Sequence, residues 1–233
     1  MGPLLLGTIL FLVLMAGLFV PLEGWFPRRA GRMTGRAVMI CVALLFVDVF
    51  AMELVGGALL ETLAALSQRA RASLWPAADA SPLLRGLAVF VLAELLGYWT
   101  HRMMHRVPWL WRFHEVHHAP THVTWLEAWR QHPVDFVIHG VIVGLPGALL
   151  GASLSEFTAI VLLRKTYTTF LHANVSWRLA WLETVIATPA FHRVHHSQDP
   201  REYDRNFAGM FPVIDTIFGT RAGSLERSLE RSL

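Results

Sequence analysis

The chain has 233 residues, of which 54% are apolar and only 16% are charged, and its mean hydropathy is +0.45. A soluble domain normally carries about 25% charged residues, so this composition excludes an ordinary soluble protein and predicts a membrane protein. The net charge of +3 comes from basic residues dispersed along the chain, a pattern that does not indicate a nucleic-acid partner. The single cysteine, Cys41, excludes an intrachain disulfide.

Five apolar segments are candidates for membrane-spanning helices, because a span requires roughly 20 mostly apolar residues. The first lacks a preceding basic stretch and a following A-x-A site, so we do not expect a cleaved signal peptide. The last two are joined by a very short link and predict a helical hairpin, in which Gly147 and Gly151 allow close helix approach. Between the second and third spans we expect an external loop containing Arg69 and Arg71 and broken by prolines. The expected spans are residues 3–22, 37–60, 83–99, 134–150 and 154–171.

The densest group of arginines near an apolar segment follows the first span, at Arg28, Arg29, Arg32 and Arg36. Such residues mark the cytoplasmic side, so the N-terminus is predicted outside and the C-terminus inside. The preference for Arg over Lys, together with abundant Ala and Leu, favours a bacterial origin. We therefore expect a protein of the bacterial inner membrane.

Two further predictions concern the charged residues inside the spans and the tryptophans next to them. Charged side chains inside a membrane usually pair within the bundle, so Arg164 and Lys165 are expected to reach the interface or to pair with Asp48 or Glu53. Residues 101–133 are amphipathic and predict a cytoplasmic cap. Its tryptophans are expected to be interfacial anchors, namely Trp109, Trp111, Trp125 and Trp129.

Three histidine clusters are the most informative feature of the sequence. Positions i, i+3 and i+4 share one face of a helix, so each cluster can direct two or three imidazoles at one point. Imidazole is the commonest metal-ligating side chain near neutral pH. The clusters read H-R-M-M-H, H-E-V-H-H and H-R-V-H-H, and they contain His101 and His105; His114, His117 and His118; and His192, His195 and His196.

The predicted topology places all three clusters, and His172 at the end of the fifth span, on one side of the membrane. These nine imidazoles are too many for one tetrahedral zinc ion. Divided between two ions they provide four or five ligands each, which favours iron with a position left for oxygen, although zinc can replace iron in a purified sample.

Two other motif interpretations are weaker. H-E-V-H-H matches the H-E-x-x-H pattern of zinc metalloproteases, with Glu115 as the base. The second triplet, however, has Arg193 where that pattern requires Glu, so the shared feature is the histidine spacing. Ferritin-like di-iron bundles need two E-x-x-H motifs, and the chain has one, formed by Glu115 and His118. An intramembrane zinc protease and a non-catalytic membrane metal- or haem-binding protein remain the alternatives.

At these residues the chain resembles the fatty acid hydroxylase/sterol desaturase superfamily of membrane di-iron enzymes. The resemblance runs over residues 94–220 and follows a fixed order of motifs: E-L-L-G-Y-W-T-H-R-M-M-H, L-W-R-F-H-E-V-H-H, L-H-A-N-V and H-R-V-H-H-S. It closes with N-F-A-G at Asn206 and D-T-I-F-G-T at Asp215.

The resemblance implies an all-α integral membrane bundle of about five spans with a cytoplasmic helical cap that holds two iron ions. Some relatives have a further ligand one turn before His172, where this chain has Thr168, and water, His132 or His139 are the possible substitutes. His122 is expected to be a non-ligand. The residues expected to support the ligands are His132, Glu94, Asn174 and Asp215. The implied metal ligands are His101, His105, His114, His117, His118, His172, His192, His195 and His196.

The implied activity is O2-dependent hydroxylation or desaturation of an unactivated C–H bond in a lipid: a sterol, fatty acyl chain, ether lipid or carotenoid. No G-x-G-x-x-G sequence is present, so electrons are expected from a separate ferredoxin or cytochrome b5-type protein with a reductase. An arginine-rich face is the predicted docking surface for this donor: Arg102, Arg106, Arg112, Arg193 and Arg201.

The sequence divides into three predicted regions. Residues 1–82 form an N-terminal membrane hairpin with its external loop, residues 83–222 form the catalytic domain, and residues 223–233 form a flexible tail with a short S-L-E-R repeat.

Overall fold

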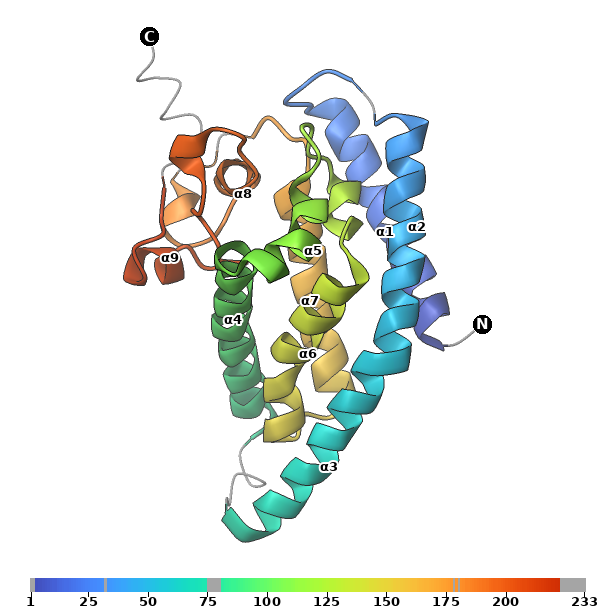
Figure 1. Cartoon of the computed structure of the whole chain (residues 1–233), viewed down its shortest axis with the longest axis vertical. Coiled ribbons are helices and arrows are strands. Elements are labelled where there is room, and N and C mark those ends of the chain that lie inside the picture. Colours follow the sequence, from blue (N-terminus) through green and yellow to red (C-terminus); the bar gives the residue numbers. More distant parts are fainter. Residues whose placement is uncertain (1–2, 32, 75–80, 178, 180, 223–233) are drawn as a thin grey trace.

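The computed structural model describes residues 3–31, 33–74, 81–177, 179 and 181–222 of the chain. Within these residues the fold is all-helical, and its only extended pairing is an isolated antiparallel bridge between Pro27 and Val175. The long helices run side by side, and α5 (Pro108–His118) and α8 (Pro189–His195) gather above one end of α4 (Pro82–Arg106) (Figure 1). The predicted all-α membrane bundle with a helical cap is thus confirmed.

Among the residues described, four helical segments are long and apolar enough to cross a membrane: Leu5–Trp25, Gly35–Ala65, Pro82–Arg106 and Pro133–Leu150. They lie in α1 (Pro3–Trp25), in α2 (Gly35–Ala51) continued through a π-helical turn (Met52–Gly56) into α3 (Gly57–Leu74), in α4, and in α6 (Pro133–Leu150). The expected fifth span is α7 (Leu154–His172), a helix of full length that carries Glu156, Arg164 and Lys165. The five predicted segments are all helices, and four of them meet the criterion for a span.

The second predicted span is longer than expected. We expected a loop after residue 60, but helix α3 continues to Leu74 and includes Arg69 and Arg71. The run after residue 60 is rich in Ala, Leu and Arg, which are strong helix formers, and it contains no Gly or Pro before Pro76. Pro76 lies outside the described residues, whereas Pro82 begins α4.

The predicted hairpin of α6 and α7 forms as expected. Gly151 adopts a left-handed conformation with φ of 66° and ends α6, a conformation that glycine accepts without steric cost. A Cβ atom at Gly147 would lie 2.7 Å from the ring of Phe157, so this glycine allows α7 to approach closely. Gly151 therefore serves the turn and Gly147 the helix contact.

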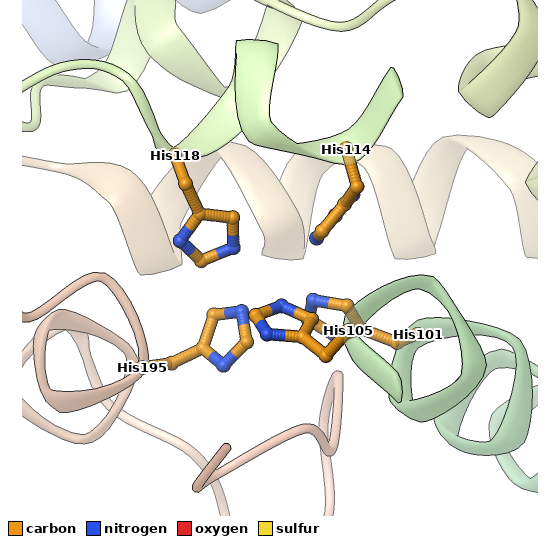
Figure 2. A group of neighbouring side chains, drawn as sticks. All are labelled: His101, His105, His114, His118 and His195. Carbon is orange, nitrogen blue, oxygen red and sulfur yellow. The ribbon is translucent and has the colours of Figure 1, made fainter. Parts of the chain in front are cut away.

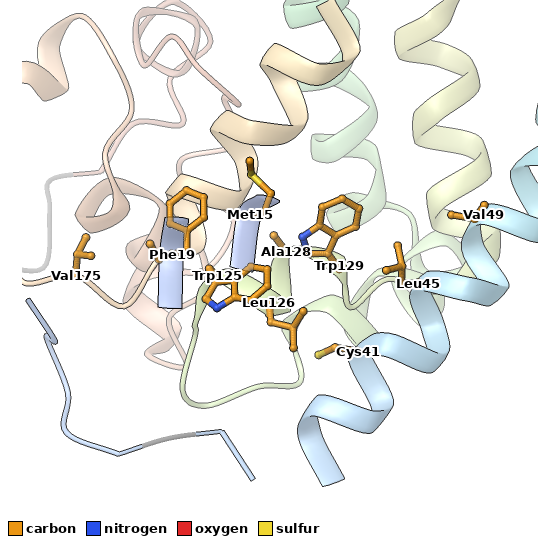
Figure 3. Close-up of a cluster of buried hydrophobic side chains, with 11 residues drawn as sticks. Met15, Phe19, Cys41, Leu45, Val49, Trp125, Leu126, Ala128, Trp129 and Val175 are labelled. Atoms are coloured by element: carbon orange, nitrogen blue, oxygen red, sulfur yellow. The ribbon is translucent and has the colours of Figure 1, made fainter. Parts of the chain in front are cut away.

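The largest buried apolar cluster joins α1 and α2 to the cap (Figure 3). Trp125 and Trp129, from the short 3-10 helix η3 (Trp125–Trp129), are 7% and 5% exposed and pack among Met15 and Leu45. The expectation that these two tryptophans are interfacial anchors is therefore wrong. The spacing of the tryptophans in the sequence does not show that helices α1 and α2 cover the cap on this side.

The charged residues of α7 also find partners other than those expected. Arg164 forms a buried ion pair with Glu94 of α4, and Lys165 donates to the carbonyl of Ala128 at 3.2 Å while lying 4.1 Å from the ring centre of Trp129. A cation over an indole face is a favourable contact. Neither side chain forms an ion pair with Asp48 or Glu53 among the described residues, although Lys165 is close enough to Asp48 of α2 to interact with it electrostatically.

The N-terminal segment is bonded directly to the cap. One carboxylate oxygen of Glu23 accepts hydrogen bonds from the backbone N–H groups of Trp125 and Asn174, both at 2.8 Å. The bridge between Pro27 and Val175 lies beside them. The first helix therefore fixes the two loops that follow the second histidine cluster and His172.

Candidate metal centre

The first two histidine clusters lie on two helices that meet at a sharp corner. Pro108 cannot continue α4, because it lacks an N–H group and occupies the first turn of α5. Helix α4 therefore ends just after His105, and α5 leads back over it. His101 and His105 are one turn apart on α4, and His114 and His118 are one turn apart on α5.

The remaining histidines come from the C-terminal half of the chain. His172 is the last residue of α7, and Thr169, three residues before it, is fully buried. The short helix α8 is capped by the hydroxyl of Thr188, which accepts from the N–H of Phe191 at 3.1 Å. Helix α8 delivers the third cluster, in which each imidazole-bearing residue is buried.

The nine histidines form two groups. Within each group, one ligand atom from every residue lies within 4.8 Å of the others. The five-histidine group draws on α4, α5 and α8, whose imidazoles point at one centre (Figure 2). It contains His101, His105, His114, His118 and His195. The four-histidine group contains His117, His172, His192 and His196.

The two groups lie against each other. The ring centres of His118 and His196, one from each group, are 4.3 Å apart, and those of His117 and His118 are 5.6 Å apart. His195 lies 4.3 Å, ring to ring, from His101 and 5.4 Å from His192. The predicted convergence of both ends of the domain on one site is therefore present in the fold.

The Nε2 atoms are arranged as ligands of a shared ion would be. Nε2 of His172 lies 3.1 Å from Nε2 of His117 and 3.2 Å from Nε2 of His192. Two nitrogens bound at about 2.1 Å to one ion and at right angles to each other lie about 3.0 Å apart. Two of the nitrogen–nitrogen distances in the four-histidine group thus match the edges of a coordination polyhedron.

In most of the rings Nδ1 is occupied by a hydrogen bond to the protein, which leaves Nε2 for a metal. A hydrogen bond at one ring nitrogen fixes the tautomer and directs the other nitrogen. In this site Nδ1 donates to protein oxygens at 2.8–3.1 Å in five of the nine rings. The pairs are His101 with the Phe207 carbonyl, His114 with the Asp135 carboxylate, His117 with the Arg130 carbonyl, His172 with the Thr168 carbonyl and His195 with the Arg205 carbonyl.

Buried nitrogens without a partner provide the test of fit for a metal. A buried polar atom that makes no hydrogen bond is costly, yet Nε2 has no hydrogen-bond partner in several of these rings. They are His101, His105, His114, His118, His195 and His196. All face into the groups just described, so the donor set fits two ions with five and four nitrogen ligands.

Burial also keeps these rings neutral, as metal ligation requires. Burial lowers the pKa of His117, His192, His195 and His196 well below the ordinary value, and the neighbouring imidazoles lower it further. A neutral imidazole has a free lone pair on the ring nitrogen that carries no proton. The site is therefore ready to bind a cation without first losing protons.

The four residues expected to support the ligands form no hydrogen bond with them. His132 caps α6 by accepting from the N–H of Val134 at 3.1 Å, and Asn174 bonds the backbone of Arg29. Glu94 pairs with Arg164 and accepts from the N–H of Met210.

Asp215 supports one of the ligands indirectly, through the backbone of Phe207. It accepts from the N–H groups of Phe207 and Ala208 at 2.8 and 2.9 Å, and the carbonyl of Phe207 in turn holds His101. Thr168, at the position where some relatives have a tenth ligand, contributes its carbonyl to His172 rather than a side chain. His122, His132 and His139 lie outside both groups, although the ring of His139 is 6.4 Å from that of His101.

Two acidic residues that the sequence analysis did not consider contact the histidines directly. Asp135, fully buried in the first turn of α6, accepts from His114 Nδ1 at 3.0 Å, and Asp204 lies 3.5 Å from His105 Nδ1. An aspartate inside the fourth apolar segment, three residues after His132, was the available signal. Acids at such positions usually serve a buried partner.

Glu115, the base required by a protease mechanism, is exposed to solvent on α5. It belongs to neither histidine group. The H-E-V-H-H sequence is therefore divided by the helix into three inward histidines and an outward glutamate, an arrangement that does not support hydrolysis.

Comparison with known proteins gives a consistent picture. The family described as fatty acid hydroxylase matches residues 86–220. Alkylglycerol monooxygenase from Danio rerio is 35% identical over 133 residues, which is 57% of this chain and 29% of that protein. Ornithine lipid hydroxylase OlsE from Rhizobium tropici is 32% identical over 130 residues, 56% of this chain and 39% of that protein. A putative methylsterol monooxygenase from Dictyostelium discoideum is 26% identical over 151 residues, 64% of this chain and 55% of that protein.

The chain thus covers less than two thirds of each of these relatives, and the matched region contains every histidine of the two groups. No solved structure matches the chain.

Proposed function

Because the chain belongs to the fatty acid hydroxylase family, we propose that it is a membrane di-iron oxygenase that hydroxylates a lipid. The observation that carries this proposal is the division of nine histidines, seven buried and two partly buried, into adjacent groups of five and four. Single-ion sites leave no role for so many imidazoles, and a structural zinc site would be closed by four ligands. The nine histidines are therefore proposed as the ligands of two iron ions.

The protein's own contribution is positioning and exclusion of water. Bound iron would supply the power to activate O2 and oxidise an unactivated C–H bond. The buried imidazoles hold the ions, and the oxygens behind them fix the ring orientations. The α-helical cap covers the site on one side and the membrane helices cover the other, so that a reactive centre is kept from bulk water.

The proposed substrate is a membrane lipid. The relatives are named for an alkylglycerol, an ornithine lipid and a methylsterol. The histidine-bearing helix α4 also has an apolar surface that can face lipid, with Leu83, Leu87 and Val91 exposed. We propose that the lipid enters from the bilayer and presents one carbon to the metal centre. Hydroxylation is preferred to desaturation because the relatives named here are hydroxylases and monooxygenases.

Electrons are proposed to come from a separate protein, a ferredoxin or cytochrome b5-type donor. The docking face expected from five arginines is reduced in the fold, because Arg193 donates to the carbonyls of Ala173 and Val175, and Arg201 pairs with Asp199. Arg106 and Arg112 remain exposed beside the cap, although Arg106 lies 3.6 Å from a carboxylate oxygen of Asp204. We propose this smaller surface as the contact for an acidic donor.

The orientation of the protein is likewise proposed. The metal centre is placed at the cytoplasmic face of a bacterial inner membrane, on the side of the arginines that follow α1. Reporter domains fused after Arg36 and after Leu233 are expected to be cytoplasmic. A periplasmic reporter at the C-terminus would contradict this orientation.

The decisive experiment is lipid mass spectrometry of cells that contain or lack the protein, grown under isotopically labelled O2. We expect a lipid that gains one labelled oxygen atom only when the protein is present. The variants His101→Ala and His172→Ala, one from each histidine group, should abolish the product, whereas His122→Ala should retain it. An unlabelled or unchanged lipid profile, with both metals bound, would contradict the proposed activity.

A further inference from the structure

One short loop after α8 contacts several rings of the five-histidine group. In residues 204–207, the carbonyl of Arg205 accepts from His195 Nδ1 at 2.8 Å, and the carbonyl of Phe207 accepts from His101 Nδ1 at 2.9 Å. These two histidines belong to different helices, α8 and α4. The loop therefore sets the orientation of rings that approach the metal position from two directions.

The same loop also reaches a third ring. The side chain of Asp204 lies 3.5 Å from His105 Nδ1 and 3.6 Å from Arg106 Nε. Three of the five imidazoles are thus backed by residues 204, 205 and 207 of one loop. Among the hydrogen bonds of the described residues, no single loop supports the four-histidine group in this way. His117 and His172 donate to the carbonyls of Arg130 and Thr168, which are far apart in sequence.

The backbone of this loop is unusual. Asp204 and Asn206 have φ angles of 57° and 56°, and among the described residues they are the two non-glycine residues with positive φ. They alternate with Arg205 and Phe207, the residues whose carbonyls accept from the histidines. A left-handed residue reverses the local direction of the chain, and with this alternation both carbonyls point at Nδ1 of a histidine. Such conformations are costly for most side chains and least so for Gly, Asn and Asp.

The conformation is held from both sides. The Asn206 side chain donates to the carbonyl of Phe191 at 3.0 Å and accepts from the N–H of Ala222 at 2.8 Å, and its backbone N–H donates to Thr220 at 2.9 Å. Asn206 is completely buried. Asp215 binds the two N–H groups that follow. Strained backbone that surrounding bonds over-determine in this way is typical of functional sites.

We infer that the loop of residues 204–207 is a positioning device that sets the metal affinity of the five-histidine group. Asp204 and Asn206 are the positioning residues, and their left-handed backbone directs the neighbouring carbonyls at His195 and His101. This inference rests on the proposed metal centre, but not on the identity of the substrate or on turnover.

The test compares two substitutions that remove the same side chain but differ in backbone freedom. Asn206→Gly and Asn206→Ala both lose the amide, and only glycine accepts a φ near 56° readily. The full chain in detergent is stripped of metal and titrated with Co(II), whose absorption bands and competition with a chelator report each bound equivalent. His101→Ala and His172→Ala assign the two equivalents to the two groups.

We expect Asn206→Ala to weaken the equivalent of the five-histidine group by roughly 10–100-fold, the usual range for loss of a ligand's support. Asn206→Gly should weaken it clearly less, and the other equivalent should keep its affinity in both. The matched control is Gly151→Ala, which places the same strain at φ of 66° in the turn between α6 and α7, distant from the histidines. Both equivalents should bind normally there.

Equal affinities for Asn206→Ala and Asn206→Gly would overturn the inference, as would a loss shared by both equivalents. If Asn206→Ala does not fold, Asp204→Ala and Asp204→Gly provide the same comparison at the other left-handed residue, with the same expected order. Because the readout is metal binding, a wild-type chain that binds two equivalents but oxidises no lipid would contradict only the proposed function.

Discussion

The two histidine groups lie side by side but are supported differently. Two of the rings in the five-histidine group contact carboxylates, Asp135 and Asp204, and two others contact carbonyls of a single loop. In the four-histidine group only carbonyls accept from the rings, and Nδ1 of His192 and of His196 has no hydrogen-bond partner.

A carboxylate behind an imidazole raises its basicity and restrains its orientation. The two proposed metal positions are therefore unequal in the support that their ligands receive. We expect the five-histidine group to bind its ion more tightly, and the four-histidine group to exchange its ion more readily.

The largest expected effect is the loss of a ligand. His195→Ala should remove the ion of the five-histidine group and nearly all turnover, because the ring lies between His101 and His118. Metal content by mass spectrometry and product formation measure both. Glu115→Gln is the matched control: this exposed side chain lies beside two proposed ligands, and its loss should leave iron and most activity intact. A dead Glu115→Gln with an active His195→Ala would instead indicate a hydrolase.

A large effect on both groups at once is expected from Arg164→Met. The pair of Arg164 with Glu94 joins α7, which carries His172, to α4, which carries His101. Removing one partner leaves a buried charge unpaired, at a cost of about 3–5 kcal/mol. Thermal unfolding in detergent should show the loss, and both metal equivalents should weaken together.

The control is the pair of Arg85 and Glu156, 2.9 Å apart, which joins the same two helices at the other end. Arg85→Met should cost about 1 kcal/mol or less, because this pair is more accessible to water. If Arg85→Met proved as destabilising as Arg164→Met, burial beneath the metal centre would not be the cause.

An intermediate effect confined to one group is expected from Asp135→Asn. The variant keeps the shape of the side chain but loses the charge behind His114, so affinity for the tightly bound ion should fall roughly 10–100-fold. Asp48→Asn, a buried aspartate on α2 that makes no hydrogen bond to a histidine, should leave both affinities unchanged. Equal effects of the two substitutions would contradict the assigned role of Asp135.

The last expected effect is a change in stability with pH that has its source in the cap, at Glu127 of η3. Burial raises the pKa of Glu127 to about 7, although bonding to the N–H of Thr124 opposes this. The folded state therefore binds a proton more readily than the unfolded state, whose pKa is near the ordinary 4.5. Stability from this group is fully present below about pH 4.5 and is lost as the pH rises through about 7.

One pKa unit corresponds to about 1.4 kcal/mol, so the slope is measurable. The unfolding temperature of metal-free protein, compared between wild type and Glu127→Gln across this interval, isolates it. An identical slope in both proteins would show that the carboxylate is not its source.

Much of the site could be predicted because helical spacing is a local property. The i, i+4 pairs on α4 and α5 place His101 with His105 and His114 with His118, as the sequence indicated. The assignment of His117 to the other group could not be predicted, because it depends on where α7 and α8 pack against α5. The resemblance to a known family supplied the rest of the expected ligand set.

The supporting residues were poorly predicted because they depend on contacts between distant segments. Position alone suggested that Glu94, Asn174 and Asp215 assist the ligands, yet the first two hold the scaffold and the third supports a loop. Asp135 was overlooked because a single acid at the start of an apolar helix resembles an N-terminal capping charge. The buried tryptophans of η3 were misjudged for the same reason, since only the tertiary fold shows α1 and α2 covering them.

The hydrogen bonds of Glu23 have a consequence for the order of synthesis and assembly. Glu23 lies in α1, which is synthesised before the other described helices, and its partner Asn174 follows 151 residues later. Contacts so distant in sequence form late, after the intervening chain has been ordered. We therefore expect the Glu23 carboxylate to lack its full set of hydrogen bonds until the segment that contains His172 and Asn174 has been synthesised and packed. Iron uptake should accordingly follow release of the whole chain, which pulse-labelling with radioactive iron can determine.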